Sequence, residues 1–180
     1  RPRFERYKEI SKKIHQIFSE YTDLIEPLSL DEAYLDVTVN KKGNPSASLI
    51  AKEIRQRILD ELKLNASAGI SNSKFVAKIA SDINKPNGQK TIPPEKVIQF
   101  LEELPIEKFY GVGKVTTQKM YSLGVFYGKD LKLKTEEFLI QHFKSSGSYY
   151  YNIVRGITNS EVKPNRKRKS VAAEHTFVQN

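Results

Sequence analysis

The hydrophobic pattern of the chain changes character at Pro93-Pro94. Before this point, stretches with the apolar spacing of an amphipathic helix alternate with short stretches typical of strands. From 95 to 155 the strand pattern is lost, and four short helical stretches follow one another through tight turns. The chain is therefore predicted to form two structural units that meet near residue 93.

The first unit is expected to contain a helix, a hairpin, a helix, a strand, a helix and a strand. Their predicted ranges are 4–21, 23–30 with 32–39, 49–62, 66–70, 73–83 and 90–92. Ser46 or Ser48 can cap the second helix. This order predicts an α+β fold with a split βαβ (ferredoxin-like) sheet and helices on one face. A small all-helical unit follows, with helices expected at 95–104, 114–123, 135–143 and 148–155.

Composition limits the kinds of site that the chain can hold. Its 180 residues are 38% hydrophobic and 28% charged, as expected for a globular protein. There is no cysteine, and His15, His142 and His175 are too far apart to suggest a zinc motif. Any metal must then be held by oxygen. No stretch is typical of a signal peptide or a membrane span, so we expect a cytoplasmic protein without a membrane partner.

The chain carries a net charge of +9, which is common in proteins that bind polyanions but also favours solubility. Six basic and two acidic residues fall within 155–180, and this local concentration favours nucleic acid as the partner. Residue 1 is Arg and the only methionine is Met120. We therefore expect the chain to be a piece of a longer protein.

Three acids interrupt the predicted hairpin in the stretch PLSLDEAYLDVT, at Asp31, Glu32 and Asp36. Acids are poor strand formers and costly to bury unpaired. At a hairpin end the backbone can turn so that Asp31 and Glu32 approach one space, where two carboxylates suit magnesium and phosphoryl chemistry. The alternative is a pair of ordinary turn residues in water, and on spacing alone this is the more common case.

The stretch SDINKPNGQ places Lys85 after a predicted helix and before Pro86. Proline biases the preceding residue toward an extended conformation, which would project the Lys85 ammonium away from the helix, where it could meet a phosphate. A solvated lysine in a turn is the alternative. Asp82 is interpreted as a surface residue at the helix end.

The stretch LPIEKFYGVGKVTTQKMYSLGV resembles a helix-hairpin-helix motif, a structure that grips the DNA backbone irrespective of sequence. Its glycines open a helix at Gly111, Val112, Gly113 and Lys114, where backbone N–H groups can approach a phosphate without a Cβ in the way. Simple packing of one helix on another is the alternative. The basic residues Lys163, Arg166, Lys167, Arg168 and Lys169 either add salt-sensitive phosphate contacts or form a solvated tether.

Taken together, SLDEAYLDVT, AGISNSKFVAKIASDINKPNGQ and PIEKFYGVGKVTTQKMYSLGV, in this order and spacing, resemble the Y-family DNA polymerases of the DinB (DNA polymerase IV) type. The resemblance implies a partial palm over 1–93, a helical thumb over 94–159, and over 160–180 a basic linker with the first strand of the little finger at KSVAAEHTF. It also implies error-prone, translesion DNA synthesis with two Mg²⁺ ions.

The resemblance assigns roles to the hairpin residues. It implies that Asp31 bridges the two metals, that Glu32 holds the metal activating the primer 3′-hydroxyl, and that Ser29 supports them. Asp36 is interpreted as structural. It implies further that Lys85 touches the triphosphate of the incoming nucleotide, and that 111–114 hold the DNA backbone.

The implied partners are primer-template DNA and a deoxynucleoside triphosphate, with a sliding clamp engaged through parts absent here, and the protein is expected to be a monomer. The family's first palm strand with a third metal-binding aspartate, the fingers and most of the little finger have no counterpart in this sequence. We therefore expect the isolated chain to be inactive. A non-catalytic helix-hairpin-helix DNA-binding module is the alternative function, and a metal-dependent nuclease is a third.

Overall fold

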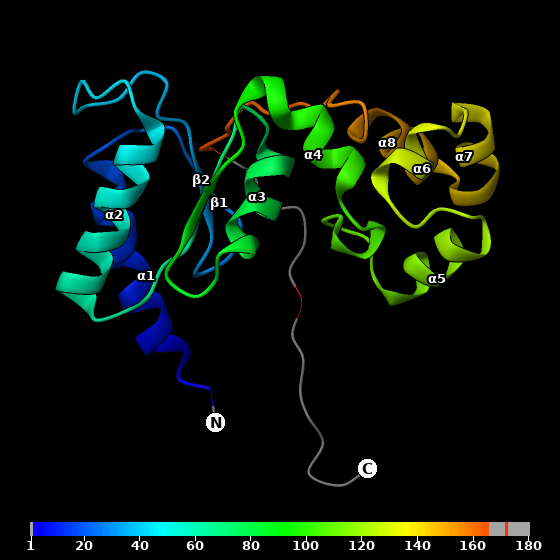
Figure 1. Cartoon of the computed structure of the whole chain (residues 1–180). Helices are drawn as coiled ribbons and strands as arrows, with labels where there is room; N and C mark the ends of the chain where they lie inside the picture. Colours follow the sequence, from blue (N-terminus) through cyan, green and yellow to red (C-terminus); the bar gives the residue numbers. More distant parts are fainter. Residues whose placement is uncertain (1, 166–171, 173–180) are drawn as a thin grey trace, which may run out of the picture.

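The computed structural model describes residues 2–165 and 172. The first part of the fold contains two long helices, two strand pairs and a third helix: α1 (Phe4–Ser19), β1 (Ile25–Pro27), β2 (Ala33–Leu35), α2 (Ala47–Leu62), β3 (Ala68–Ile70), α3 (Lys74–Ile83) and β4 (Gln89–Thr91). In Figure 1, α1 and α2 lie at one end of the molecule, and α3 lies between them and the second part.

The second part is built only from short helices. These are two 3₁₀ turns, η1 (Pro94–Lys96) and η2 (Ile106–Lys108), and the helices α4 (Val97–Glu103), α5 (Lys114–Ser122), α6 (Gly128–Lys132), α7 (Glu136–Phe143) and α8 (Ser145–Ile153). The prediction of an α+β part followed by a helical part is confirmed. Sequence periodicity did not predict α6, because five residues are too few to show a helical repeat. Within the described ranges, no helix is long and apolar enough to cross a membrane.

Serine and threonine side chains cap the N-termini of α2, α3 and α7. Ser46, Ser73 and Thr135 each accept a hydrogen bond from the backbone N–H three residues on, which satisfies a donor that the helix itself cannot. Of the two serines predicted as caps for the second helix, Ser46 is the one that caps α2.

The strands form two separate pairs. β1 and β2 pair antiparallel with Glu26 opposite Tyr34, and β3 and β4 pair parallel with Gly69 opposite Lys90. The predicted hairpin is therefore present, although its strands are shorter than expected. β1 ends at Pro27, which has no N–H to donate to a ladder. Among the described residues the two pairs are not hydrogen-bonded into one continuous sheet.

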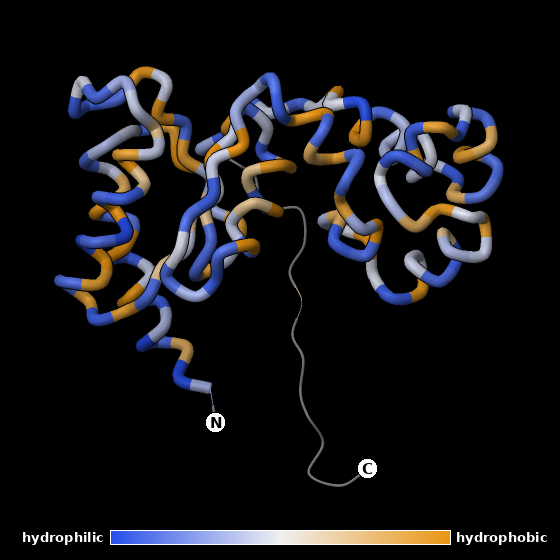
Figure 2. Tube along the Cα trace, viewed as in Figure 1, coloured by the Kyte–Doolittle hydropathy of each residue, from blue (hydrophilic) through white to orange (hydrophobic). Residues whose placement is uncertain are grey.

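The buried hydrophobic side chains form two separate clusters, and these do not correspond to the two strand pairs. One cluster joins α1 and α2 through Ile17, Tyr21, Ile50, Ile54 and Ile58. The other, which we call the α3–thumb core, begins at Phe75 on α3 and continues without a break through Leu101, Phe109 and Met120 to Val154. Figure 2 shows hydrophobic positions recurring between hydrophilic ones along these helices. The buried side chains of α3 therefore share one cluster with the helical part, whereas the helix itself packs on β3 and β4. The predicted domain boundary near 93 remains a prediction.

A glycine allows β3 to lie directly against α3. A Cβ built on Gly69 would stand 1.8 Å from the backbone oxygen of Ala77 and 2.5 Å from the backbone nitrogen of Ser81. Both atoms belong to the α3 backbone, which cannot move aside as a flexible side chain could. Any larger residue at this position must push α3 away from the sheet.

Gly69→Ala should lower the free energy of unfolding by about 3 kcal/mol, because overpacking of a rigid contact forces the backbone to shift. Chemical denaturation of the variant would measure the loss. Gly113→Ala is the matched control, since its backbone has φ −85° and nothing lies within 4 Å of its added Cβ. The control should stay within about 0.5 kcal/mol of the original chain. Equal stability of the two variants would contradict the close approach at Gly69.

Candidate active site and DNA-contact surface

The hairpin loop between β1 and β2 carries the acids predicted to hold metal. The backbone N–H of Leu28 donates to the carbonyl of Glu32 at 2.9 Å and closes the loop. Inside it, Ser29 Oγ donates to Asp31 Oδ1 at 2.6 Å, and Asp31 is exposed to solvent. The structure thus brings Ser29 and Asp31 into contact. Asp36 lies beyond β2, where its carboxylate accepts the N–H of Thr38 at 2.9 Å.

Glu32 is the first member of a row of alternating charges that ends at Lys85. Lys78 Nζ lies 3.0 Å from Glu32 Oε1 and 3.7 Å from Asp82 Oδ2, and Lys85 Nζ lies 2.5 Å from Asp82 Oδ1. Lys78 and Asp82 are four residues apart on α3, so they share one face of the helix. The helix therefore connects the acidic loop to the predicted nucleotide-binding lysine.

The two middle groups of this row, Lys78 and Asp82, are held in their charged forms. Burial alone would lower the pKa of Lys78, but the hydrogen bond to Glu32 and the charge of Asp82 raise it overall. Burial alone would raise the pKa of Asp82, but the hydrogen bond from Lys85 and the charge of Lys78 lower it overall. At neutral pH the Lys78 ammonium and the Asp82 carboxylate are both ionised.

The position of Lys85 differs from the prediction in one respect. Its side chain is 52% exposed, but the ammonium lies against Asp82 on the last turn of α3 and does not project from the helix. Asp82 is an exposed residue at the helix end, as interpreted from the sequence, and it also contacts both lysines. A phosphate that reaches Lys85 has to compete with this carboxylate.

Tyrosine rings lie beneath the two lysines of α3. Lys74 Nζ lies 5.5 Å from the ring centre of Tyr34, and Lys78 Nζ lies 5.7 Å from that of Tyr110, which belongs to the thumb. Burial raises the pKa of Tyr34 to about 12, so its phenol is neutral at physiological pH. The faces of the two rings attract the ammonium groups and hold them at the junction between hairpin and thumb.

The donor set of the loop suits a hard divalent cation. Asp31 and Glu32 are adjacent carboxylates, and magnesium is commonly bound by one or two carboxylates with waters and substrate phosphates. No group of three or more acidic, histidine or cysteine side chains that could hold a metal occurs among the residues that the structure describes. The carboxylates of the loop thus have the chemistry of a magnesium ligand set that includes waters and phosphates.

The glycine hairpin of the thumb has the form predicted from its sequence. Gly111 has φ +88°, a conformation that favours glycine, and it turns the chain toward α5. Val112 is buried, whereas Gly111, Gly113 and Lys114 are exposed. No side chain caps the start of α5 at Gly113, and no atom lies within 4 Å of the Cβ positions of the two glycines. The first N–H groups of the helix are therefore accessible to an anion such as a phosphate.

The segment that follows α8 returns to α3, a feature that the sequence reasoning missed. Lys74 donates from its backbone N–H to Ser160 Oγ at 3.3 Å and from Nζ to the Glu161 carbonyl at 2.7 Å. Lys74 Nζ also pairs with Glu26 Oε2 at 2.8 Å, and the same oxygen accepts the N–H of Lys163 at 2.8 Å. Local sequence does not indicate this contact, because Lys74 and Ser160 are 86 positions apart in the chain.

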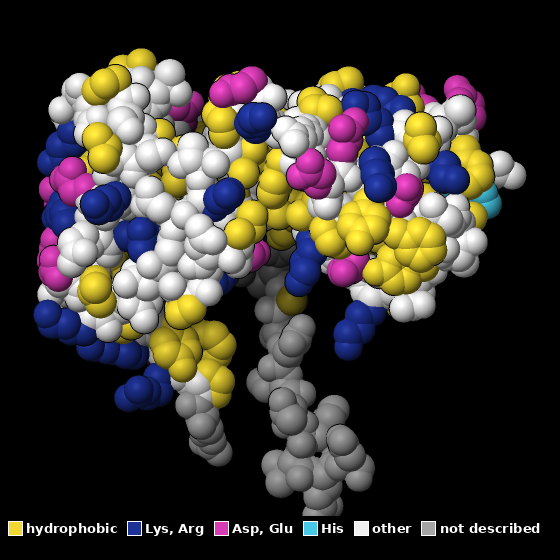
Figure 3. All heavy atoms as spheres, viewed as in Figure 1, with side chains coloured by type: hydrophobic (Ala, Val, Ile, Leu, Met, Phe, Trp, Pro, Cys, Tyr) yellow, Lys and Arg dark blue, Asp and Glu magenta, His cyan; other side chains and the backbone are white. Residues whose placement is uncertain are grey.

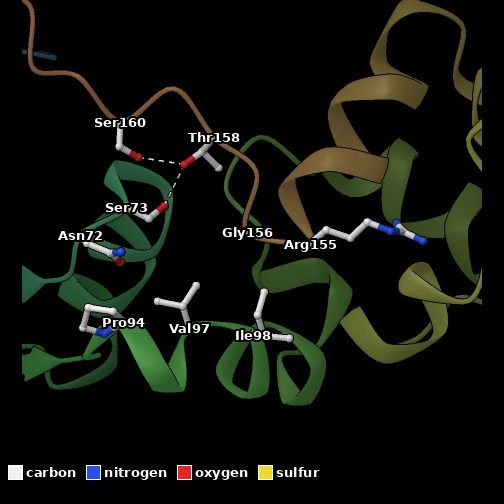
Figure 4. Close-up of a pocket in the computed structure, with 9 residues that line it drawn as sticks. All are labelled: Asn72, Ser73, Pro94, Val97, Ile98, Arg155, Gly156, Thr158 and Ser160. Carbon is white, nitrogen blue, oxygen red and sulfur yellow. Dashed lines mark hydrogen bonds between the residues drawn. The ribbon is translucent and has the colours of Figure 1, made fainter.

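A shallow pocket of about 290 Å³ lies beside this contact, at the start of α3. Figure 4 shows Ser73, Thr158 and Ser160 joined by hydrogen bonds along its rim, and Arg155 pointing away from it. Lys163 itself is exposed. The remaining basic residues predicted to touch DNA, Arg166, Lys167, Arg168 and Lys169, lie outside the described residues, as does almost all of the strand predicted at 169–177.

Comparison with known proteins agrees with this arrangement. A model of the impB/mucB/samB family matches residues 1–82, and a model of the IMS family HHH motif matches residues 94–125. DNA polymerase IV of Leptospira interrogans is 56% identical over 176 residues, which cover 98% of this chain and 49% of the relative. DNA polymerase IV of Listeria monocytogenes is 55% identical over 174 residues, or 97% of this chain and 49% of the relative.

Solved structures show the same fold. A Y-family DNA polymerase chimera superimposes with a TM-score of 0.83 at 32% identity, covering 93% of this chain and 49% of that one. DinB from Sulfolobus solfataricus gives a TM-score of 0.83 at 31% identity, covering 90% and 48%. Over nearly its whole length the chain is therefore similar to DNA polymerase IV and to solved Y-family and DinB polymerases. It spans about half the length of the curated relatives that it matches.

The two lysines that contact Asp82 lead to a testable prediction about the pKa of its carboxyl group. Lys78→Met should raise the pKa of Asp82 toward the ordinary aspartate value of 3.8, because the carboxylate loses one of its two cations. Carboxyl NMR titration would measure it, with Lys90→Met on β4 as a control that leaves the pKa of Asp82 unchanged. The pKa of Asp82 is lower in the folded chain than its ordinary value of 3.8, so its carboxylate stabilises the fold above pH 3.8. This stability is lost as the pH falls through the pKa that Asp82 has in the folded chain. An unaltered Asp82 titration in Lys78→Met would contradict the coupling.

Proposed function

We propose that this chain is the palm and thumb part of a DNA-directed DNA polymerase that adds deoxynucleotides to a primer 3′-hydroxyl during error-prone, translesion synthesis. The observation that carries the proposal is the pair Asp31 and Glu32 in the hairpin loop, adjacent to a row of charges that ends at Lys85. Relatives named DNA polymerase IV and a structural neighbour described as an insertion ternary complex of Dbh DNA polymerase support it.

Asp31 and Glu32 are the residues that would hold Mg²⁺, with two ions in the complete enzyme. When bound, the metal neutralises charge on the reacting phosphates and favours the 3′-oxygen as a nucleophile. Ser29 orients the Asp31 carboxylate through its 2.6 Å hydrogen bond. Glu32 accepts a hydrogen bond from the Lys78 ammonium at 3.0 Å, so Glu32 would have to exchange this lysine for the metal in order to hold it.

Lys85 is the residue proposed to bind the triphosphate of the incoming nucleotide. Its ammonium is paired with Asp82 at 2.5 Å, and a phosphate oxygen would take the place of that carboxylate. An exchange of one charged partner for another keeps the ammonium neutralised in both states, which limits the cost of releasing Asp82. Lys85 would thereby hold the triphosphate against the hairpin loop.

The thumb is proposed to hold the backbone of primer-template DNA through Gly111, Val112, Gly113 and Lys114. Backbone N–H groups at the start of α5 meet phosphates irrespective of base sequence. Lys163 and the basic residues from 166 to 169 would add further phosphate contacts. Lys and Arg side chains are spread over both parts of the surface in Figure 3, so steering of DNA does not depend on this run alone.

Several finer features belong to the same proposal. The complete protein would act as a cytoplasmic monomer in DNA repair and would engage a sliding clamp through parts outside this chain. The isolated chain is expected to bind DNA without extending a primer, because the resemblance implies a third metal-binding aspartate that this sequence does not contain. A DNA-binding module without catalysis is the competing function, favoured by the open glycine hairpin.

Asp31→Ala or Glu32→Ala in the complete protein should slow primer extension by roughly a thousandfold, because several kcal/mol of charge stabilisation are lost. Affinity for primer-template DNA should change by less than about twofold, since neither acid contacts the DNA backbone in this account. Asp36→Ala is the matched control from the same segment and should retain activity. Substantial extension by either of the first two variants would remove the proposed metal-binding role of that acid. No extension by the unsubstituted complete protein would return the function to DNA binding alone.

The isolated chain should bind two unrelated duplexes equally, with a dissociation constant on the order of 10⁻⁴ to 10⁻⁶ M at physiological salt. Lys114→Ala should reduce the slope of log affinity against log salt by about 0.9, the value of one phosphate contact. Fluorescence anisotropy across a salt series measures both quantities. Lys52→Ala, an exposed lysine on α2, should leave the slope unchanged. Binding indifferent to salt would contradict the phosphate-gripping role.

A further inference from the structure

Arg55 on α2 makes hydrogen bonds that hold the turn over 84–89, which contains Lys85. Its Nε donates to the carbonyl of Ala66 at 3.0 Å, and Nη1 donates to Gln89 Oε1 at 3.0 Å. Its Nη2 donates both to the backbone oxygen and to the side-chain Oδ1 of Asn87, the latter at 3.0 Å. One guanidinium thus joins the loop before β3, the turn after α3 and the first residue of β4.

The turn is held from its other side as well. Asn84 Nδ2 donates to the carbonyl of Gln89 at 2.8 Å, and the N–H of Ala68 donates to the carbonyl of Gly88 at 3.0 Å. Asn87 adopts φ +49°, a left-handed conformation that is less favourable for a non-glycine residue. Two of the Arg55 contacts go to this residue, so they stabilise the conformation that the turn requires.

The chemistry of the contact requires arginine. The guanidinium is planar and directs its N–H groups in fixed directions, which allows it to bind three separate segments at once. A lysine would keep the positive charge, but its single ammonium cannot reach Ala66, Asn87 and Gln89 together. The contact therefore depends on the shape of the group as well as on its charge.

We propose that Arg55 is a positioning residue for nucleotide binding, which acts by fixing the 84–89 turn so that the Lys85 ammonium stands where the triphosphate arrives. The inference rests on the proposed function, because it needs Lys85 to contact the nucleotide. Among the described residues, the Arg55 guanidinium donates to Ala66, Asn87 and Gln89 and to no member of the row of charges on α3. Its effect passes through the backbone between Asn87 and Lys85.

The test is steady-state primer extension by the complete polymerase that contains this chain. Arg55→Lys should raise the KM for the incoming nucleotide about five- to tenfold, with little change in kcat or in DNA affinity. This rise corresponds to part of the free energy that one hydrogen bond to a charged group contributes. Arg57→Lys is the matched control on the same helix. Arg57 pairs with Glu20 and Glu61, away from the turn, so this variant should keep the original KM.

A double-mutant cycle separates this inference from the proposed function. In a Lys85→Ala background, Arg55→Lys should raise the KM no further, because its effect passes through that lysine. A rise in KM for Lys85→Ala together with an unchanged KM for Arg55→Lys would overturn the inference alone. An unchanged KM for Lys85→Ala would instead overturn the proposed role of the lysine. Equal additional effects in both backgrounds would show that Arg55 acts without Lys85, which also contradicts the inference.

Discussion

The arrangement of the molecule depends on the two faces of α3. Phe75, Val76, Ile79 and Ala80 are buried in the α3–thumb core. Lys74 and Lys78, one helical turn apart, instead pair with the hairpin acids Glu26 and Glu32. The same ten-residue helix therefore ties the acidic loop to the thumb, and Gly69 allows it to pack directly on the sheet beneath. A shift of this helix would move the acids and the DNA-contact surface relative to each other.

Charge pairing holds the site in the absence of substrate. Each group proposed to meet nucleotide or metal has an opposite charge or a hydroxyl beside it: Glu32 binds Lys78, Lys85 binds Asp82 and Asp31 binds Ser29. These groups are partly exposed, so each pair contributes little to stability and its partners can be exchanged. The pair of Glu26 with Lys74 is different, because Glu26 is only 7% exposed. Breaking a buried pair leaves an uncompensated charge, so the pair of Glu26 and Lys74 holds β1 and α3 in a fixed position.

Local sequence predicted the positions of the helices better than the pairing of the strands. The helical spacing of apolar residues placed α1, α2 and α3 within a few residues of their bounds, and the acids at 31 and 32 marked the end of the hairpin. These features depend on nearby residues and on capping, which local sequence can indicate. The strand pairing was less accessible, because β3 and β4 are joined through α3 and their register is decided by packing on that helix.

The candidate site shows the same division. The sequence singled out Asp31, Glu32, Lys85 and the glycine hairpin as candidates. Spacing alone favoured ordinary turn residues for the two acids, and the resemblance to the Y-family DNA polymerases implied the role of each candidate. The sequence did not indicate Lys78 or Arg55. Lys78 faces Glu32 across 46 positions of the chain, and Arg55 reaches Asn87 across 32. A charged residue on a helix is ordinary in sequence, and only the fold shows which distant group it meets.

Native-state amide hydrogen exchange tests most directly the claim that α3 and the thumb form one unit. If they share one core, the slowest amides of α3, α4 and α5 should exchange through a common opening, with free energies that agree within about 0.5 kcal/mol and respond equally to denaturant. The α1–α2 cluster, which has a separate buried core, should exchange through an opening of its own. Exchange of α3 together with α1 and α2, while the thumb helices open independently, would contradict the account.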